Sequence, residues 1–158
     1  MANIILGTSE DGIRVYYHPE GHSHRADLNK EVISKITIAD RPFVRETVSL
    51  GRTIGVDHLV STTEDDKVVL WTRPGRKSPS RMVLNRQAAD TDRVTVIIAK
   101  CGEEDGDLSG KYALVTLFEG EPGMPERDDD PECREFWTKY ALVPTDEELK
   151  LMRKEGLA

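Results

Sequence analysis

Cysteine is scarce in this chain, and long apolar runs and an N-terminal targeting pattern are missing. The two cysteines, Cys101 and Cys133, lack the close spacing of metal ligands, so free thiols in a reducing compartment are favoured over a disulfide. The opening segment MANIILGTSEDG has no basic stretch before its short apolar run, which argues against a signal peptide. Every apolar run is too short to cross a bilayer. We therefore expect a cytoplasmic protein that makes no use of a membrane.

Length and composition favour one folded domain. The chain has 158 residues, of which 37% are hydrophobic and 32% are charged. The hydrophobic residues occur in blocks, unlike those of a disordered chain, and a chain of this length buries roughly two-thirds of its unfolded surface. A disulfide scaffold and a fibrous rod are therefore excluded, and we expect no structural metal and no cofactor. The net charge of −7 opposes nonspecific binding to nucleic acid.

Apolar–polar alternation and β-branched residues predict strands through most of the chain. Residues 4–6 and 13–17 flank the turn-rich segment GTSEDG and are expected to form a hairpin. The segment EVISKITI is rich in β-branched residues, so a strand is favoured there over a short helix. Residues 93–100 form the most apolar run, with 111–118 as the expected neighbour. The strands are expected at residues 4–6, 13–17, 31–38, 43–50, 67–72, 81–84, 93–100 and 111–118.

Two short helices are expected near the C-terminus. Asp130 can cap a helix over residues 132–140, with Pro131 at its first position. Thr145 and Glu148 have the spacing of a capping box, and Gly156 suits the end of that helix. The order predicts an α+β fold, a mainly antiparallel twisted sheet with both helices packed on one side. We expect a single domain over 1–158: an N-terminal hairpin and histidine-containing loop (1–40), a sheet core (41–143) and a C-terminal helix (144–158).

Charge is distributed unevenly along the chain. Residues 67–101 hold eight basic and two acidic residues, whereas residues 102–135 are strongly acidic. A local cationic cleft acts over roughly 8–10 Å and can exist on an acidic protein. Arginines near the strand ends of this segment can bind phosphate oxygens bidentately. The alternative is that these charges only solvate a sheet face and pair with the acidic segment.

Histidine, threonine and tryptophan supply the remaining candidates. His58 can exchange protons near neutral pH, although a lone histidine beside a turn is more often structural. In KYALVTLF, Thr116 shares a predicted face with Tyr112, Leu114 and Phe118, where its hydroxyl can orient a phosphate or satisfy the backbone. Trp71 can stack a base, but a core position is at least as consistent with the pattern. A metal site at His18, His22 and His24 has little support, because no ligand completes it.

Several segments in order resemble a known group of proteins. They are RPFVRETVSLGRTIG, HLVSTTEDDKVVLWTRPGR, SRMVLNR, KYALVTLFEGEPGMPE and EFWTKYALV, between residues 41 and 143. This order resembles bacterial and phage proteins of the barnase/EndoU/colicin/RelE-like ribonuclease fold. The resemblance implies a toxin-like, metal-independent endoribonuclease that cleaves RNA by attack of a ribose 2′-hydroxyl on phosphorus. It implies His58 as acid or base, Arg73 and Arg81 as phosphate clamps, Thr116 as an orienting hydroxyl, and Arg76 and Lys77 as steering charges.

The second member of an acid–base pair is not evident from the sequence. Glu46 serves as the base if its strand faces the cleft, and otherwise forms a salt bridge with Arg45 or with a neighbouring strand. RNA cleavage or RNA binding is therefore one hypothesis, with an antitoxin or immunity protein as a further partner. The other is a non-enzymatic module of phage or toxin–immunity type, whose acidic loops at 103–107 and 128–132 bind a basic protein.

Overall fold

The computed structural model describes residues 3–127 and 129–158, and the fold is α+β, as predicted. Two compact units make up the chain. Unit 1 holds the described residues up to Gly55 together with Thr91–Glu121, and unit 2 holds Val56–Asp90 and the described residues from Pro122 to Ala158. The predicted core segment 41–143 therefore contributes strands to both units. Each unit is described separately.

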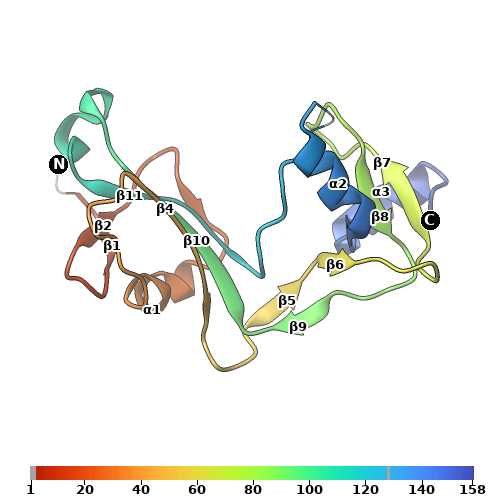
Figure 1. The fold of residues 1–158 in the computed structure, drawn as a ribbon, viewed down its shortest axis with the longest axis horizontal. Coiled ribbons are helices and arrows are strands. Elements are labelled where there is room, and N and C mark those ends of the chain that lie inside the picture. Colours follow the sequence, from red (N-terminus) through yellow and green to blue (C-terminus); the bar gives the residue numbers. More distant parts are fainter. Residues whose placement is uncertain (1–2, 128) are drawn as a thin grey trace. The chain divides into compact units, whose positions relative to one another are not determined.

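A six-stranded sheet forms the frame of unit 1 (Figure 1). Its path runs β1-β2-β11-β10-β4, and β3 pairs with β11 beside that path. The predicted hairpin of β1 and β2 is confirmed as an antiparallel pair. The prediction that β10 and β11 are neighbours is also confirmed, and they pair antiparallel. The strands are β1 (Ile5–Thr8), β2 (Arg14–Tyr16), β3 (His22–Ser23), β4 (Phe43–Ser49), β10 (Arg93–Lys100) and β11 (Tyr112–Glu119).

One face of this sheet carries the core of unit 1. Val94, Val96 and Ile98 alternate along β10 with no exposed surface, which is the period-2 pattern of a strand with one buried face. Their cross-strand partners include Val44 on β4 and Leu117 on β11, which are equally buried. The core position of β10 agrees with the prediction made from the apolar run over residues 93–100.

A β-bulge at Val115 changes which residues of β11 share a face. Ile98 pairs with Leu114 and Ile97 pairs with Thr116, so Val115 is an extra residue without a direct partner on β10. Leu114 and Leu117 therefore face the core, and Thr116 faces the opposite side. The prediction that Tyr112, Leu114, Thr116 and Phe118 form one row was wrong, because simple alternation does not anticipate the extra residue.

The predicted strand over residues 31–38 was also wrong. The start of the segment is the end of α1 (Asn29–Ile33), which directly follows η1 (Ala26–Leu28), and the rest of the segment has no strand. Asn29, Val32, Ile33 and Ile36 are all buried, which is the i, i+3, i+4, i+7 spacing of a helical face. Burial against the sheet therefore outweighs the strand preference of the β-branched residues.

Asp11 accepts hydrogen bonds from the turn that follows α1, and the lowered pKa of its carboxyl group predicts that stability depends on pH. Hydrogen bonds from Ser9 and from the backbone N–H groups of Ala39 and Ile38 lower the pKa of Asp11 from 3.8 to about 2. The folded-state pKa lies below the unfolded one, so the stabilisation is complete above pH 3.8 and is lost as the pH falls through about 2.

Asp11→Asn is accordingly expected to lower the urea midpoint of unit 1 at pH 7 and to match the wild type only once the pH is below about 2. Far-ultraviolet circular dichroism at several pH values measures this. Glu10→Gln is the control, because no hydrogen bond involves the exposed Glu10 side chain in the described part of the chain. A wild-type midpoint for Asp11→Asn at pH 7 would refute the role of the carboxylate.

Unit 2 is built on a four-stranded sheet of order β6-β12-β8-β7. Trp71, Met82 and Met152 form one buried cluster, and Val60, Val83, Ala141 and Val143 form another. Predicted strands are confirmed for β7 and β8, whereas β6 and β12 were not anticipated. The elements are β6 (Leu59–Ser61), β7 (Val68–Trp71), β8 (Ser80–Val83), α2 (Pro131–Lys139), β12 (Tyr140–Leu142) and α3 (Asp146–Lys154).

Both predicted helix starts are confirmed in unit 2. The Asp130 side chain accepts hydrogen bonds from the backbone N–H groups of Glu132 and Cys133, with Pro131 at the first helical position. Thr145 and Glu148 form the expected capping box of α3, and Gly156 has a φ of 77° just after that helix. Local side-chain hydrogen bonds therefore mark where these two helices begin.

In a separate two-stranded sheet, each strand includes a point where the chain passes from one unit to the other. It pairs β5 (Gly55–Asp57) with β9 (Ala89–Thr91). The 3-10 segment η2 (Glu103–Leu108) lies in unit 1, between β10 and β11. No helix in the described part of the chain combines the length and the apolar character needed to cross a membrane.

Candidate nucleic-acid interface

The two catalytic candidates of unit 1 lie on opposite faces of its sheet. Thr116 pairs with Ile97, which pairs in turn with Arg45, so these three share one face. Glu46 pairs with Val96, which lies on the core face, and its carboxylate bonds to Arg41 at 3.2 Å. Glu46 is therefore in a salt bridge, but its partner is Arg41, just before β4, and not Arg45 or a neighbouring strand. The structure does not bring Glu46 and Thr116 together.

The other predicted site residues all belong to unit 2. Trp71 is 5% exposed, packs with Met82 and Met152, and donates its indole N–H to Glu155. Its ring faces lie inside the core and do not form a stacking surface. The core interpretation of Trp71 is the one that the structure shows.

Two of the predicted phosphate clamps are bonded within the protein. Arg73 donates to Ser80 Oγ at 3.1 Å and forms an ion pair with Glu126. Arg81 donates to the carbonyl oxygens of Trp137 and Tyr140, at the end of α2. These bonds fix both guanidinium groups in place. Arg76 and Lys77 are exposed on the loop between β7 and β8, as their steering role requires.

A hollow of about 450 Å³ in unit 2 gathers several cations around one aromatic ring. We call it the arginine hollow. Arg81 is the predicted site residue that lines it. The lining also includes Leu70, Glu126, Arg127, Arg134 and Trp137.

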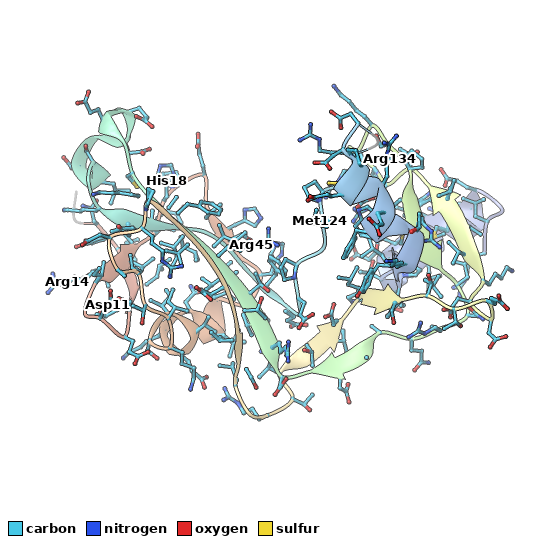
Figure 2. The ribbon with its side chains drawn as sticks, viewed as in Figure 1. Asp11, Arg14, His18, Arg45, Met124 and Arg134 are labelled. Carbon is cyan, nitrogen blue, oxygen red and sulfur yellow. The ribbon has the colours of Figure 1, made fainter. Side chains whose placement is uncertain are left out.

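The charges around the arginine hollow are only partly balanced by the protein. Glu126 is bonded to Arg73 and to the hydroxyl of Ser80, so its charge is already paired. Arg127 forms a bidentate pair with the exposed Asp129, which raises the pKa of the guanidinium. The Arg134 side chain, on α2, is exposed (Figure 2). Its guanidinium forms no hydrogen bond or ion pair in the described part of the chain, although its charge helps to lower the pKa of Asp129. A bound anion therefore finds one unpaired guanidinium beside one that is paired only at the surface.

Trp137 presents its ring to the arginine hollow in a fixed orientation. Its indole nitrogen lies 3.1 Å from the carbonyl oxygen of Met124 and 3.2 Å from that of Pro125. Phe136 contacts the indole edge-on, with ring centroids 5.0 Å apart. The sequence analysis selected Trp71 and missed Trp137, although the flanking Arg134 and the FW pair on a capped helix were visible signals.

His58 lines a different hollow of unit 2, of about 490 Å³, together with Arg86 and Thr145. Its Nδ1 lies 2.7 Å from the carbonyl oxygen of Val143, and because a carbonyl only accepts, Nδ1 carries the proton. Nε2 makes no hydrogen bond in the described part of the chain. This is the geometry of an oriented imidazole, but the phosphate clamp Arg81 lines the arginine hollow and not this one.

The three histidines of the N-terminal loop lie in unit 1 and do not converge. His18 Nε2 is 2.7 Å from Asp105, and its Nδ1 accepts from the backbone N–H of Glu20 (Figure 2). His22 and His24 contact each other edge-to-face at 5.0 Å. Among residues 3–127 and 129–158, no group of three histidine, cysteine or acidic residues is placed to hold a metal ion.

Both cysteines are free thiols, and neither is arranged as a nucleophile. Burial raises the pKa of Cys101, and the nearby Asp105 carboxylate raises it further. Burial likewise raises the pKa of Cys133. Both thiols therefore stay protonated at neutral pH, which disfavours attack on a substrate.

Comparisons with protein-family models, with curated proteins and with solved structures found no match. The resemblance to the ribonuclease-like group therefore stays a prediction that rests on the segments quoted for it.

Proposed function

We propose that the protein binds single-stranded RNA through the arginine hollow. The observation that carries this proposal is the grouping of Arg81, Arg127 and Arg134 around the oriented indole of Trp137. A cationic groove beside an aromatic ring is the combination by which proteins hold a single strand, with phosphates on the cations and a base on the ring. RNA is the strand that the sequence resemblance indicates.

The hollow suits a single strand better than a duplex. Its volume of about 450 Å³ admits a nucleotide but not a helix. The exposed Leu70 at its edge extends the apolar surface that a base contacts. The protein is acidic in total, but charges beyond roughly 10 Å are screened at physiological salt. The attraction of RNA phosphates therefore depends on the charges near the arginine hollow.

Binding, and not cleavage, is the activity that this site supports. Metal-independent cleavage needs a proton acceptor beside the phosphate clamps, and His58 lines another hollow. Glu126 is the carboxylate that lines the arginine hollow, and it is held by Arg73 and Ser80. The proposal therefore assigns the arginines to positioning of the strand.

Fluorescence anisotropy with a labelled single-stranded RNA tests the proposal. Arg134→Ala is expected to weaken binding by about tenfold and to lower the salt slope by about one. Trp137→Leu is expected to cost about 1–3 kcal/mol of binding free energy. Glu126→Gln is expected to strengthen binding, because it removes a negative charge and keeps an oxygen for Ser80.

Arg14→Ala is the matched control, since Arg14 is an exposed arginine on β2 of unit 1 (Figure 2). Equal losses for Arg14→Ala and Arg134→Ala would refute a specific site. The same RNA is run on a denaturing gel with and without EDTA. RNA fragments that form in the presence of EDTA but not with His58→Ala would show that the function is RNA cleavage and not RNA binding alone.

One observation favours binding of a basic protein as a second candidate function. In η2 the side chain of Asp105 bonds to His18, whereas Glu103, Glu104 and Asp107 are exposed and form no ion pair in the described part of the chain. Such a cluster attracts a cationic surface. Binding of the chain to a lysine-rich peptide, lost when these three acids are neutralised and unaffected by Arg134→Ala, would support this role.

A further inference from the structure

A second, smaller hollow lies in unit 1 beside the polar loop that follows β2. Its volume is about 190 Å³, and β3, the turn before α1 and β11 all contribute to it. We call it the Asn29 hollow. Its walls include Leu6, Tyr17, His22, Ala26, Asn29 and Leu114.

Asn29 is the buried polar group of this hollow, and half of its amide is unsatisfied. The side chain is 92% buried, since Asn29 is 8% exposed. Its Oδ1 accepts a hydrogen bond from Ser23 Oγ at 2.7 Å, whereas its Nδ2 has no partner among the described residues.

The unpaired Nδ2 retains access to the hollow. Among the side-chain polar atoms of the described residues, Tyr112 Oη is the one that is fully buried and has no hydrogen-bond partner. Asn29 Nδ2 also has no partner, so it cannot be fully buried and must keep some exposed surface. Because Asn29 is otherwise enclosed and borders the hollow, the accessible surface of Nδ2 belongs there. An unpaired donor beside an apolar wall is costly unless a ligand or water accepts from it.

The remaining walls describe an uncharged, flat ligand. Leu6, Ala26 and Leu114 are apolar, and the ring of Tyr17 is 45% exposed. No carboxylate, ammonium or guanidinium group lines the hollow within the described residues. The ionisable groups of the lining include the imidazoles of His18 and His22, and His18 already bonds to Asp105. A flat ring can contact the apolar side chains and the ring of Tyr17.

The volume suits a small ring. About 190 Å³ is well below the roughly 300–1,000 Å³ of drug-sized sites. We propose that the Asn29 hollow binds a pyrimidine base, whose ring carbonyl accepts the free N–H of Asn29. Adenine has no ring carbonyl and lacks this acceptor. This site does not depend on RNA binding by the arginine hollow.

Titration of the full chain with free uridine tests the proposal. We expect shifts of the imidazole signals of His18 and His22 in proton NMR, because both rings line the hollow. Adenosine is expected to bind at least tenfold more weakly than uridine. Free nucleosides keep this test independent of the arginine hollow, which is probed with the RNA strand.

Two variants separate the site from a general effect on folding. Asn29→Asp keeps an oxygen for Ser23 and removes the N–H donor, so uridine affinity is expected to fall at least tenfold. Ala26→Leu fills the hollow from an exposed position and is expected to abolish the shifts even where Asn29→Asp disturbs the fold. Ala89→Leu, at an exposed alanine of β9, is the control.

Each outcome decides the proposal. No uridine-dependent shift in the wild type, or equal uridine affinity in Ala26→Leu, overturns it. Equal affinity for adenosine and uridine also overturns it, since the ring carbonyl would then not govern selection. Loss of uridine binding in Ala26→Leu with retention in Ala89→Leu supports it. If Ala26→Leu retains RNA binding, the proposal for the arginine hollow holds whether or not uridine binds.

Discussion

Trp71→Ala is expected to lower the free energy of unfolding of unit 2 by about 3–5 kcal/mol and to leave RNA binding by the folded protein unchanged. The indole is 5% exposed and fills the space between Met82 and Met152, so its removal leaves a cavity. It also leaves the Glu155 carboxylate without its indole donor. The ring contributes to packing and not to the arginine hollow.

Tryptophan fluorescence during urea unfolding measures this effect, because Trp71 and Trp137 are the two tryptophans of the chain and both lie in unit 2. Leu70→Ala is the control on the same strand. Leu70 is 64% exposed, so its truncation is expected to cost less than about 0.5 kcal/mol. A Trp71→Ala protein that has wild-type stability but no longer binds RNA would contradict this prediction and assign Trp71 to the RNA-binding site.

Local chemistry explains why much of the fold could be predicted. The alternation of β10 specifies a strand whatever surrounds it, and observed β10 covers the predicted residues 93–100. Asp130 and Thr145 mark helix starts through hydrogen bonds to the next two or three residues. Such signals are complete within a few residues, so a single sequence suffices to detect them.

The errors arise where distant contacts decide the structure. The bulge at Val115 depends on how β10 and β11 align, and α1 depends on burial of Val32 and Ile33 against the sheet. Neither alignment nor burial partners can be read from nearby residues.

The site residues show the same limit. Clustering of Arg73 and Arg81 along the chain indicated a cationic region, and Arg81 does line the arginine hollow. Arg134 and Trp137 join that hollow from α2, more than fifty residues later. The sequence therefore predicted the type of charge at the site, but the choice between Trp71 and Trp137 needed the three-dimensional structure.

Gly21→Ala is expected to be the most disruptive single-methyl change in unit 1, with a loss of about 3 kcal/mol of stability. A β-carbon at Gly21 would fall on the backbone carbonyl oxygen of Leu114, far inside van der Waals contact. The loop before β3 must then move away from β11, where His22 and Ser23 pair with Thr116 and Leu117. That movement opens the Asn29 hollow, so uridine binding is expected to be lost as well.

Gly102→Ala is the matched control within the same unit. Its β-carbon would meet only the Glu104 carboxylate, the end of a flexible side chain that can turn away, and its φ of −91° is available to alanine. We expect a change below about 0.5 kcal/mol for this variant. Hydrogen exchange of the β11 amides measures both proteins. Protection that is equal in Gly21→Ala and Gly102→Ala would show that the loop before β3 does not pack closely on β11, and the Asn29 hollow would lose one of its walls.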